Sequence, residues 1–268
     1  MTSALAAENA APLPAKTPAK HNIIAVASGK GGVGKTWFSI TLAHALANAG
    51  QKALLFDGDL GLANVDVQLG ATPRRDLASV IAGEATLAQA ATPHAAGFDI
   101  IAGRSGSGGL ANLAASRLLD LRAELGRFGQ AYDWVVLDLG AGIERTVRML
   151  TNEARVCLVV TTDEPTSITD AYAYIKVTAL EHLAGGIQLV VNMVPNVRDG
   201  ERTYSTLLRA CREFLKLEPP LAGIIRRDDH VKDTIRRQSP LLTRSPTCDA
   251  AEDVGQIARR LMNELRSR

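Results

Sequence analysis

Residues 25–36 have the sequence Ala25-Val26-Ala27-Ser28-Gly29-Lys30-Gly31-Gly32-Val33-Gly34-Lys35-Thr36. An apolar run at residues 22–27 leads into it and predicts a buried parallel strand. The glycines let backbone N–H groups point at phosphate oxygens, Lys35 can reach β- and γ-phosphates, and the Thr36 hydroxyl can ligate Mg²⁺. The segment therefore predicts a phosphate-binding loop between a strand and a helix, with a nucleoside triphosphate and Mg²⁺ as its ligands.

Short apolar runs recur along the chain between helical stretches. They cover residues 52–56, 98–101, 134–137, 156–160, 187–191 and 221–225. Residues 37–49 carry an apolar stripe at helical spacing, and Gly50 follows its end. This alternation predicts an α/β fold with a doubly wound, mostly parallel sheet and helices on both faces.

Length and composition fit one α/β domain. The chain has 268 residues, 46% of them hydrophobic, which is enough for a full core. Residues 1–21 contain three prolines between alanines and have no apolar periodicity, so we expect a flexible N-terminal tail and an ATPase domain at residues 22–268. The formal net charge of +2 is too small to indicate nucleic-acid or membrane binding without a local patch.

Cysteine and histidine usage gives no sign of a second metal centre. The three cysteines are far apart and form no CxxC pair. Their spacing favours a protein of a reducing compartment and argues against an iron–sulfur or structural zinc site. The five histidines lack ligand spacing, so we expect no metal other than Mg²⁺. No run of about 18 apolar residues occurs, and the first residues lack the basic start of a signal peptide. We therefore expect a cytoplasmic protein, with peripheral attachment to the inner membrane as an alternative.

Polar residues follow several of the predicted strands. They are Asp57, Asp59, Asp138, Thr161 and Asn192. Ligands of doubly wound sheets bind beyond the carboxyl ends of the strands, where these residues fall. A single Asp at such a place more commonly caps a helix or turn, so the argument depends on several of them meeting at one edge.

Lys30 narrows the choice among P-loop families, because an ordinary P-loop does not require lysine directly after its first glycine. With it the loop resembles the deviant Walker A family of MinD, ParA, nitrogenase iron protein and the arsenite-pump ATPases. In that family this lysine crosses a nucleotide-sandwich dimer to the partner's phosphates, much as an arginine finger acts in trans. The resemblance implies a Mg²⁺-dependent ATPase that forms a homodimer with ATP and returns to the monomer after slow hydrolysis to ADP and phosphate.

The resemblance also implies roles for individual residues. The catalytic set would be Lys30, Lys35 and Asp59, where Asp59 orients the attacking water. Mg²⁺ would be held by Thr36, Asp57 and Asp138, since residues 135–142 resemble a Walker B strand that runs into switch II. The implied nucleotide contacts are Gly29, Lys30, Gly31, Gly32, Val33, Gly34, Lys35, Thr36, Asn192 and Arg226. Asn192 would read adenine, and Arg226 stands where many relatives have proline.

Three segments narrow the resemblance to one branch. Residues 59–66, Ser105-Gly106 with residues 110–113, and residues 161–172 together resemble the FlhG/FleN branch. These are MinD-like ATPases that set the number and placement of bacterial flagella. The branch implies flagellar assembly proteins, a partner GTPase or a transcription regulator as partners. Residues 1–21 lack the N-terminal motif with which many members stimulate that GTPase, and the polar residues of 161–172 would also serve as helix caps.

Two other functions stay open. A ParA-type partitioning ATPase would bind DNA through a basic patch, for which Arg226/Arg227 and Arg236/Arg237 are candidates, although the charge makes nucleic acid an unfavoured partner. A MinD-type ATPase would cycle on membranes through a C-terminal helix. Residues 254–265 are amphipathic, but they contain no Trp or Phe, so packing on the sheet is favoured. Trp37 stands where related chains commonly have a small hydroxyl residue after the P-loop threonine. Helix packing or a contact with the switch segments would account for the tryptophan.

Overall fold

The computed structural model describes residues 22–59, 61–103, 115–180 and 186–266. Within them the chain forms one sheet with the strand order β3-β4-β2-β5-β1-β6-β7-β8. The strands are β1 (Ile23–Ser28), β2 (Ala53–Gly58), β3 (Thr92–Pro93), β4 (Asp99–Ile101), β5 (Trp134–Ala141), β6 (Val156–Thr161), β7 (Ile187–Val194) and β8 (Leu221–Arg226). All neighbouring pairs are parallel except β3 with β4, which confirms the doubly wound sheet.

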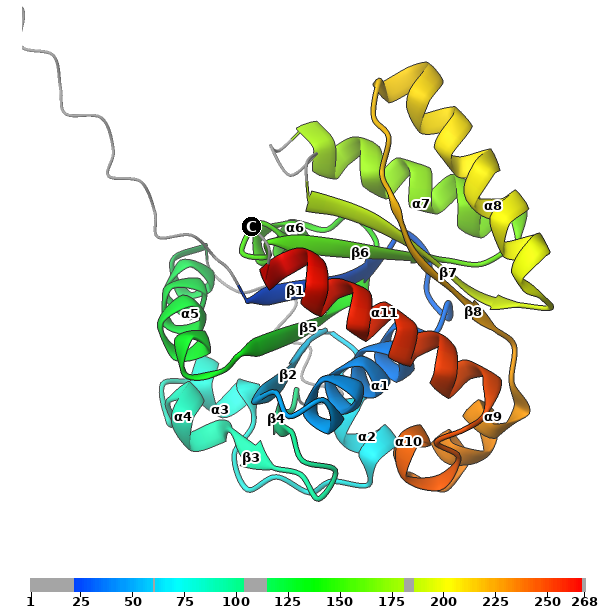
Figure 1. The fold of residues 1–268 in the computed structure, drawn as a ribbon. Helices are drawn as coiled ribbons and strands as arrows, with labels where there is room; N and C mark the ends of the chain where they lie inside the picture. The colour runs from blue at the N-terminus through cyan, green and yellow to red at the C-terminus, as the bar shows by residue number, and fades with distance from the viewer. Residues whose placement is uncertain (1–21, 60, 104–114, 181–185, 267–268) are drawn as a thin grey trace, which may run out of the picture.

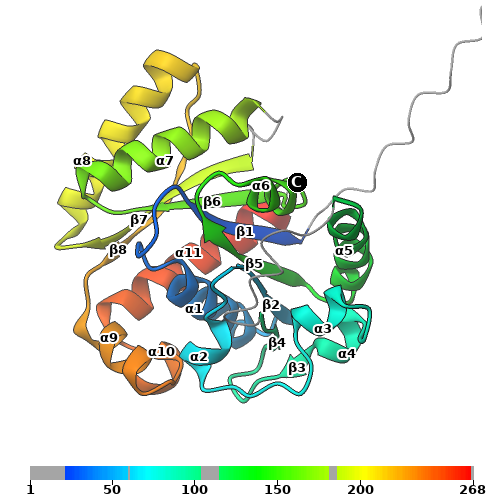
Figure 2. The ribbon, with the colours of Figure 1, turned by 180° about the vertical axis from the view of Figure 1, so that it is seen from behind.

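Helices follow most of the strands and cover both faces of the sheet (Figures 1 and 2). They are α1 (Lys35–Asn48), α2 (Val65–Leu69), α3 (Leu77–Ile81), α4 (Leu87–Ala90), α5 (Ala115–Phe128), α6 (Arg145–Thr151), α7 (Pro165–Thr178), α8 (Val197–Ala210), α9 (Asp229–Arg236), α10 (Leu241–Arg244) and α11 (Asp249–Arg266). A short 3₁₀ turn (Gly129–Ala131) precedes β5, and a π-helical turn (Cys211–Leu215) extends α8.

The core consists of two apolar layers separated by the sheet. One layer contains residues of α3 to α8, and the other contains residues of α1, α2, α10 and α11. Strand side chains alternate between them: Ala25 and Ala27 of β1 belong to the first layer, Ile24 and Val26 to the second. Strands that are buried on both faces are continuously apolar in sequence. These strands could therefore be predicted from their apolar runs.

Several strands continue further than their apolar runs. β5 ends at Ala141 and β7 at Val194, so Asp138 and Asn192 lie within strands rather than at their ends. Polar side chains inside a strand interrupt the apolar pattern on which the prediction depends. The two-residue antiparallel strand β3 was also not predicted, because it is too short to show alternation.

The C-terminal helix α11 packs against β8 and α1 (Figure 1). Val254, Ile257 and Leu261 are at most 2% exposed. A Cβ on Gly223 of β8 would come within 2.4 Å of Ile257, so helix and strand are in close contact. The expectation that this helix is a core element is confirmed for these residues. No helix in the described part of the chain has the length and apolar character needed to cross a membrane.

Three sequence assignments lie outside the described residues. They are the proposed tail at residues 1–21, one of the three branch segments (Ser105-Gly106 with residues 110–113), and the side chain of Leu265.

Candidate nucleotide-binding site

A cavity of about 540 Å³ opens at the carboxyl ends of the central strands, within the size range of ligand pockets. It is lined by the loop between β1 and α1, by residues after β2 and β5, and by the start of α6. The loop can turn here because Gly34 has φ +86°, a conformation that favours glycine. A Cβ at Gly34 would also lie 2.5 Å from the Asn192 amide. The phosphate-binding loop predicted from sequence therefore lies at the edge where the sheet places ligands.

Lys35 is buried at the inner end of this loop, with 8% of its surface exposed. Its Nζ donates a hydrogen bond to Ser28 Oγ at 2.9 Å, and Ser28 Oγ donates to the Lys30 carbonyl at 2.6 Å. Burial lowers the pKa of Lys35, while the carboxylates of Asp138 and Asp59 oppose that shift. The free loop thus holds a poorly solvated ammonium group that a phosphate could neutralise.

Asp57 and Asp138 form a buried pair of carboxyl groups, at 0% and 1% exposure. Burial raises the pKa of both, and for Asp57 the neighbouring Asp138 charge adds to the shift. Asp138 accepts hydrogen bonds from Thr36 and from Ser39 Oγ, the latter at 3.0 Å. A divalent cation would relieve this unfavourable burial of negative charge. Two carboxylates and a hydroxyl are hard oxygen donors that fit Mg²⁺.

Asp57 also organises the segment after β2. Its Oδ2 accepts backbone N–H bonds from Asn64 and Val65, each at 3.1 Å, and its Oδ1 accepts one from Asp59 at 3.2 Å. The start of α2 is therefore tied to the candidate metal site. A change at the metal would be transmitted directly to this loop.

Asp59 lines the cavity beside the segment after β5. Its Oδ1 accepts N–H bonds from Gly61 at 3.2 Å and Leu62 at 2.9 Å. A Cβ added to Gly140 would lie 3.3 Å from the same oxygen. Glycine at position 140 therefore allows the end of β5 to approach this carboxylate, where an attacking water could be oriented.

Lys30 lies outside the cavity, although it belongs to the same loop. Its Nζ contacts Glu164 Oε2 at 2.6 Å and Thr166 Oγ1 at 2.9 Å, at the start of α7. The hydrogen bond with Lys30 lowers the pKa of Glu164. Lys30 and Lys35 therefore face different surroundings, and Lys30 makes no contact with the cavity of its own chain. The sequence singled out residues 161–172 but did not anticipate this contact.

Asn192 braces the loop from β7. Its Nδ2 donates to the Val33 carbonyl at 2.8 Å, and its Oδ1 accepts from the Met193 N–H at 2.8 Å. It is 2% exposed and does not line the cavity. The adenine contact expected of Asn192 stays a prediction, while its position against the phosphate-binding loop is a contact that the sequence did not reveal.

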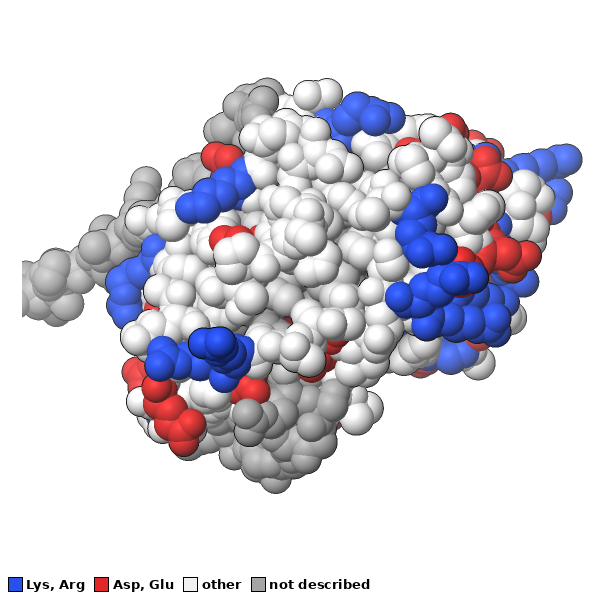
Figure 3. Space-filling view, turned by 90° about the horizontal axis from the view of Figure 1, so that it is seen from below, with Lys and Arg blue, Asp and Glu red and all other residues white. Residues whose placement is uncertain are grey.

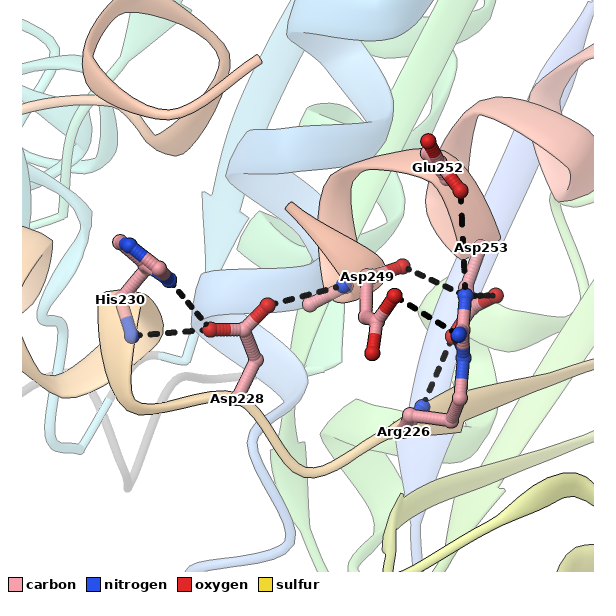
Figure 4. Close-up of polar contacts among 7 residues, drawn as sticks. Arg226, Asp228, His230, Asp249, Glu252 and Asp253 are labelled. Carbon is pink, nitrogen blue, oxygen red and sulfur yellow. Dashed lines mark hydrogen bonds and ion pairs between the residues drawn. The ribbon is translucent and has the colours of Figure 1, made fainter. Parts of the chain in front are cut away.

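The Arg226 side chain is directed at α11 (Figure 4). Its guanidinium donates to both carboxylate oxygens of Asp253 at 2.9 Å and pairs with Asp249 at 2.7 Å. The hydrogen bonds with Asp253 raise its pKa. Arg226 does not line the cavity, so its nucleotide contact stays a prediction, and in this structure the side chain joins β8 to α11.

Trp37 has a packing role. It is 6% exposed and belongs to the apolar layer that contains α1 and α11. Trp37 is also one of the residues that line the cavity. Of the two explanations drawn from sequence, helix packing is therefore confirmed.

Comparisons with known proteins find similar chains that match this one over most of its length. The family model described as the CobQ/CobB/MinD/ParA nucleotide binding domain matches residues 24–241. The antiactivator FleN of Pseudomonas aeruginosa is 35% identical over 239 residues, which cover 89% of this chain and 85% of FleN. The flagellum site-determining protein YlxH of Helicobacter pylori is 33% identical and the match covers 90% and 82% of the two chains. The MinC:MinD cell division protein complex of Aquifex aeolicus aligns with TM-score 0.73 at 26% identity, covering 90% of this chain and 96% of the other.

Proposed function

Because this chain belongs to the CobQ/CobB/MinD/ParA nucleotide-binding family, we propose that it is a dimerisation switch that controls the number or placement of flagella. It is a P-loop ATPase of the MinD/ParA type. ATP and Mg²⁺ bind in the cavity at the carboxyl ends of the central strands, and hydrolysis to ADP ends the dimeric state. Its relative YlxH is named a flagellum site-determining protein, which supports the same output here.

The position of Lys30 carries the dimer proposal. Lys35 is buried beside the candidate metal ligands, whereas Lys30 is on the surface and bound to Glu164. A lysine that is directed at α7, outside the cavity of its own chain, is placed to act on the phosphates of a second copy. In this arrangement Lys35 binds ATP, Lys30 stabilises the charge that develops in the partner's transition state, and Asp59 orients the water.

The chemistry depends on positioning. Thr36, Asp57 and Asp138 would hold Mg²⁺, which would neutralise the phosphate charge during transfer. Backbone N–H groups at residues 29–36 and the Lys35 ammonium would fix the triphosphate. Gly140 leaves room for the Asp59 carboxylate beside the end of β5, so the segments after β2 and β5 would respond together to loss of the γ-phosphate.

Two lysine variants test this assignment. Lys35→Ala should bind no Mg-ATP, whereas Lys30→Ala should bind ATP as a monomer and lose hydrolysis. Binding is read from nucleotide titration, and dimer formation from sedimentation velocity with ATP and with ADP. Normal hydrolysis by Lys30→Ala would remove the basis of the proposal. Flagellar output is tested by counting flagella in cells that carry Lys35→Ala in place of the natural protein.

The structure gives less support to DNA partitioning. Arg226 pairs with Asp253 and Asp249, and Arg237 pairs with Asp233 at 2.9 Å. On the face in Figure 3, Lys and Arg side chains form separate groups, several with acidic side chains beside them. Protein partners of the flagellar apparatus are therefore proposed in preference to DNA. An ATP-dependent, salt-sensitive DNA shift would reverse that preference.

A further inference from the structure

Three potential metal ligands from the beginnings of two helices, α9 and α11, lie close together. Asp228 ends the loop after β8, His230 lies in the first turn of α9, and Cys248 immediately precedes α11. Their carboxylate, imidazole and thiol ligand atoms all lie within 4.8 Å of one another. None of the three lines the nucleotide cavity.

Asp228 is fixed between His230 and the start of α11 (Figure 4). Its Oδ1 accepts from the His230 backbone N–H at 3.0 Å and contacts His230 Nδ1 at 2.7 Å. Its Oδ2 accepts from the Ala250 N–H at 3.2 Å, in the first turn of α11. The carboxylate thus joins the beginnings of two helices, and its position does not depend on the solvent-exposed imidazole.

Cys248 presents its sulfur to the same carboxylate. The thiol is hydrogen-bonded to Asp228, and backbone N–H groups of Ala250 and Ala251 point at the sulfur. The Cys248 carbonyl accepts the first helical hydrogen bond of α11, from Glu252 at 3.0 Å. The sulfur therefore lies beside the Asp228 carboxylate at the N-terminus of an 18-residue helix, although burial and the Asp228 charge raise the pKa of the Cys248 thiol.

The geometry points to a binding site for one divalent cation of the Zn²⁺ class, formed by Asp228, His230 and Cys248. Oxygen, nitrogen and sulfur donors together suit this borderline-soft ion. Tetrahedral zinc ligands lie about 3.5 Å apart, so the group needs to contract only slightly. The His230 side chain is 61% exposed and is free to make that adjustment. The cation would take the place of the side-chain protons of His230 and Cys248 that now lie between these groups and Asp228, and would leave a fourth position for water.

Co²⁺ provides a spectroscopic test on the full chain. The protein is stripped with a chelator and titrated with Co²⁺ in excess Mg²⁺, which occupies the all-oxygen nucleotide site. We expect one equivalent of Co²⁺ with visible d–d bands and a near-ultraviolet thiolate-to-cobalt band, both removed by Zn²⁺. Co²⁺ held only by oxygen ligands cannot give the thiolate band, so a spectrum without it would overturn the inference.

The variants keep the helix caps intact. Cys248→Ser retains an N-cap hydroxyl and should remove the thiolate band while the protein stays folded. His230→Ala leaves the backbone bonds of Asp228 in place and should weaken Co²⁺ binding at least tenfold. Cys211→Ser and His94→Ala are matched controls elsewhere in the fold and should bind as the unmodified chain does. A band that survives Cys248→Ser, or unchanged affinity in His230→Ala, would refute the three-ligand site.

Discussion

Replacing Leu261 with alanine tests whether α11 is a structural helix or a membrane anchor. Leu261 is 0% exposed and packs in the same apolar layer as Val254 and Ile257, against β8 and α1. Truncating a fully buried leucine removes its transfer free energy and leaves a cavity, which together cost about 2–5 kcal/mol. Single domains are stable by about 5–15 kcal/mol. The substitution should therefore remove a large fraction of the total stability.

The assay is urea unfolding of Leu261→Ala beside Arg259→Ala, an exposed neighbour on the same helix. The control should change the free energy of unfolding by no more than about 0.5 kcal/mol. Both proteins are also sedimented with vesicles in the presence of Mg-ATP. If Leu261→Ala keeps its stability but loses vesicle binding, the buried-face argument is wrong and α11 acts on membranes.

Three further perturbations follow from the site and its surroundings. Mg-ATP at a hundredfold excess over Kd should stabilise the unmodified chain by about 2.7 kcal/mol, and Lys35→Ala should lose this stabilisation in thermal melting. The control Lys52→Ala, at an exposed lysine, should keep the stabilisation by Mg-ATP. Burial lowers the pKa of His44 to about 4, so the folded protein favours the neutral imidazole. The free energy of unfolding should therefore fall as pH drops from 6.5 towards 4. Melting curves of His44→Gln should show a weaker decline over the same pH range. Arg226→Ala leaves three carboxylates of α11 without their cation and should cost about 2 kcal/mol in urea unfolding. Its ATP affinity should change little, and a large loss of affinity with unchanged stability would instead place Arg226 at the nucleotide.

The parts predictable from sequence were those set by local pattern. The buried strands are recognisable because both faces of the sheet are covered, so their residues are continuously apolar. The phosphate-binding loop is recognisable because glycine, lysine and threonine are required at fixed spacing. Lys35, Thr36, Asp57 and Asp138 accordingly meet at one edge of the sheet, as the strand order requires.

Contacts between distant segments were not predictable. Lys30 meets Glu164 across 134 positions, and Asn192 meets the Val33 carbonyl across 159. No local pattern specifies such pairs, because they depend on which strands become neighbours. The same limit applies to His230 and Cys248. Their spacing in the sequence matches no metal-binding motif, and they become neighbours only because the fold brings the loop after β8 to the start of α11.

The contact between Lys30 and Glu164 bears on how the switch would operate. The isolated chain already satisfies the Lys30 ammonium with one carboxylate and one hydroxyl. Exposed ion pairs of this kind contribute little to stability, so the pair is a weak restraint. A triphosphate in a second copy offers more negative charge than one carboxylate, and closing the dimer would exclude water and strengthen the attraction. Lys30 can therefore exchange Glu164 for a partner's phosphates when ATP is present, and return when hydrolysis and phosphate release remove that charge.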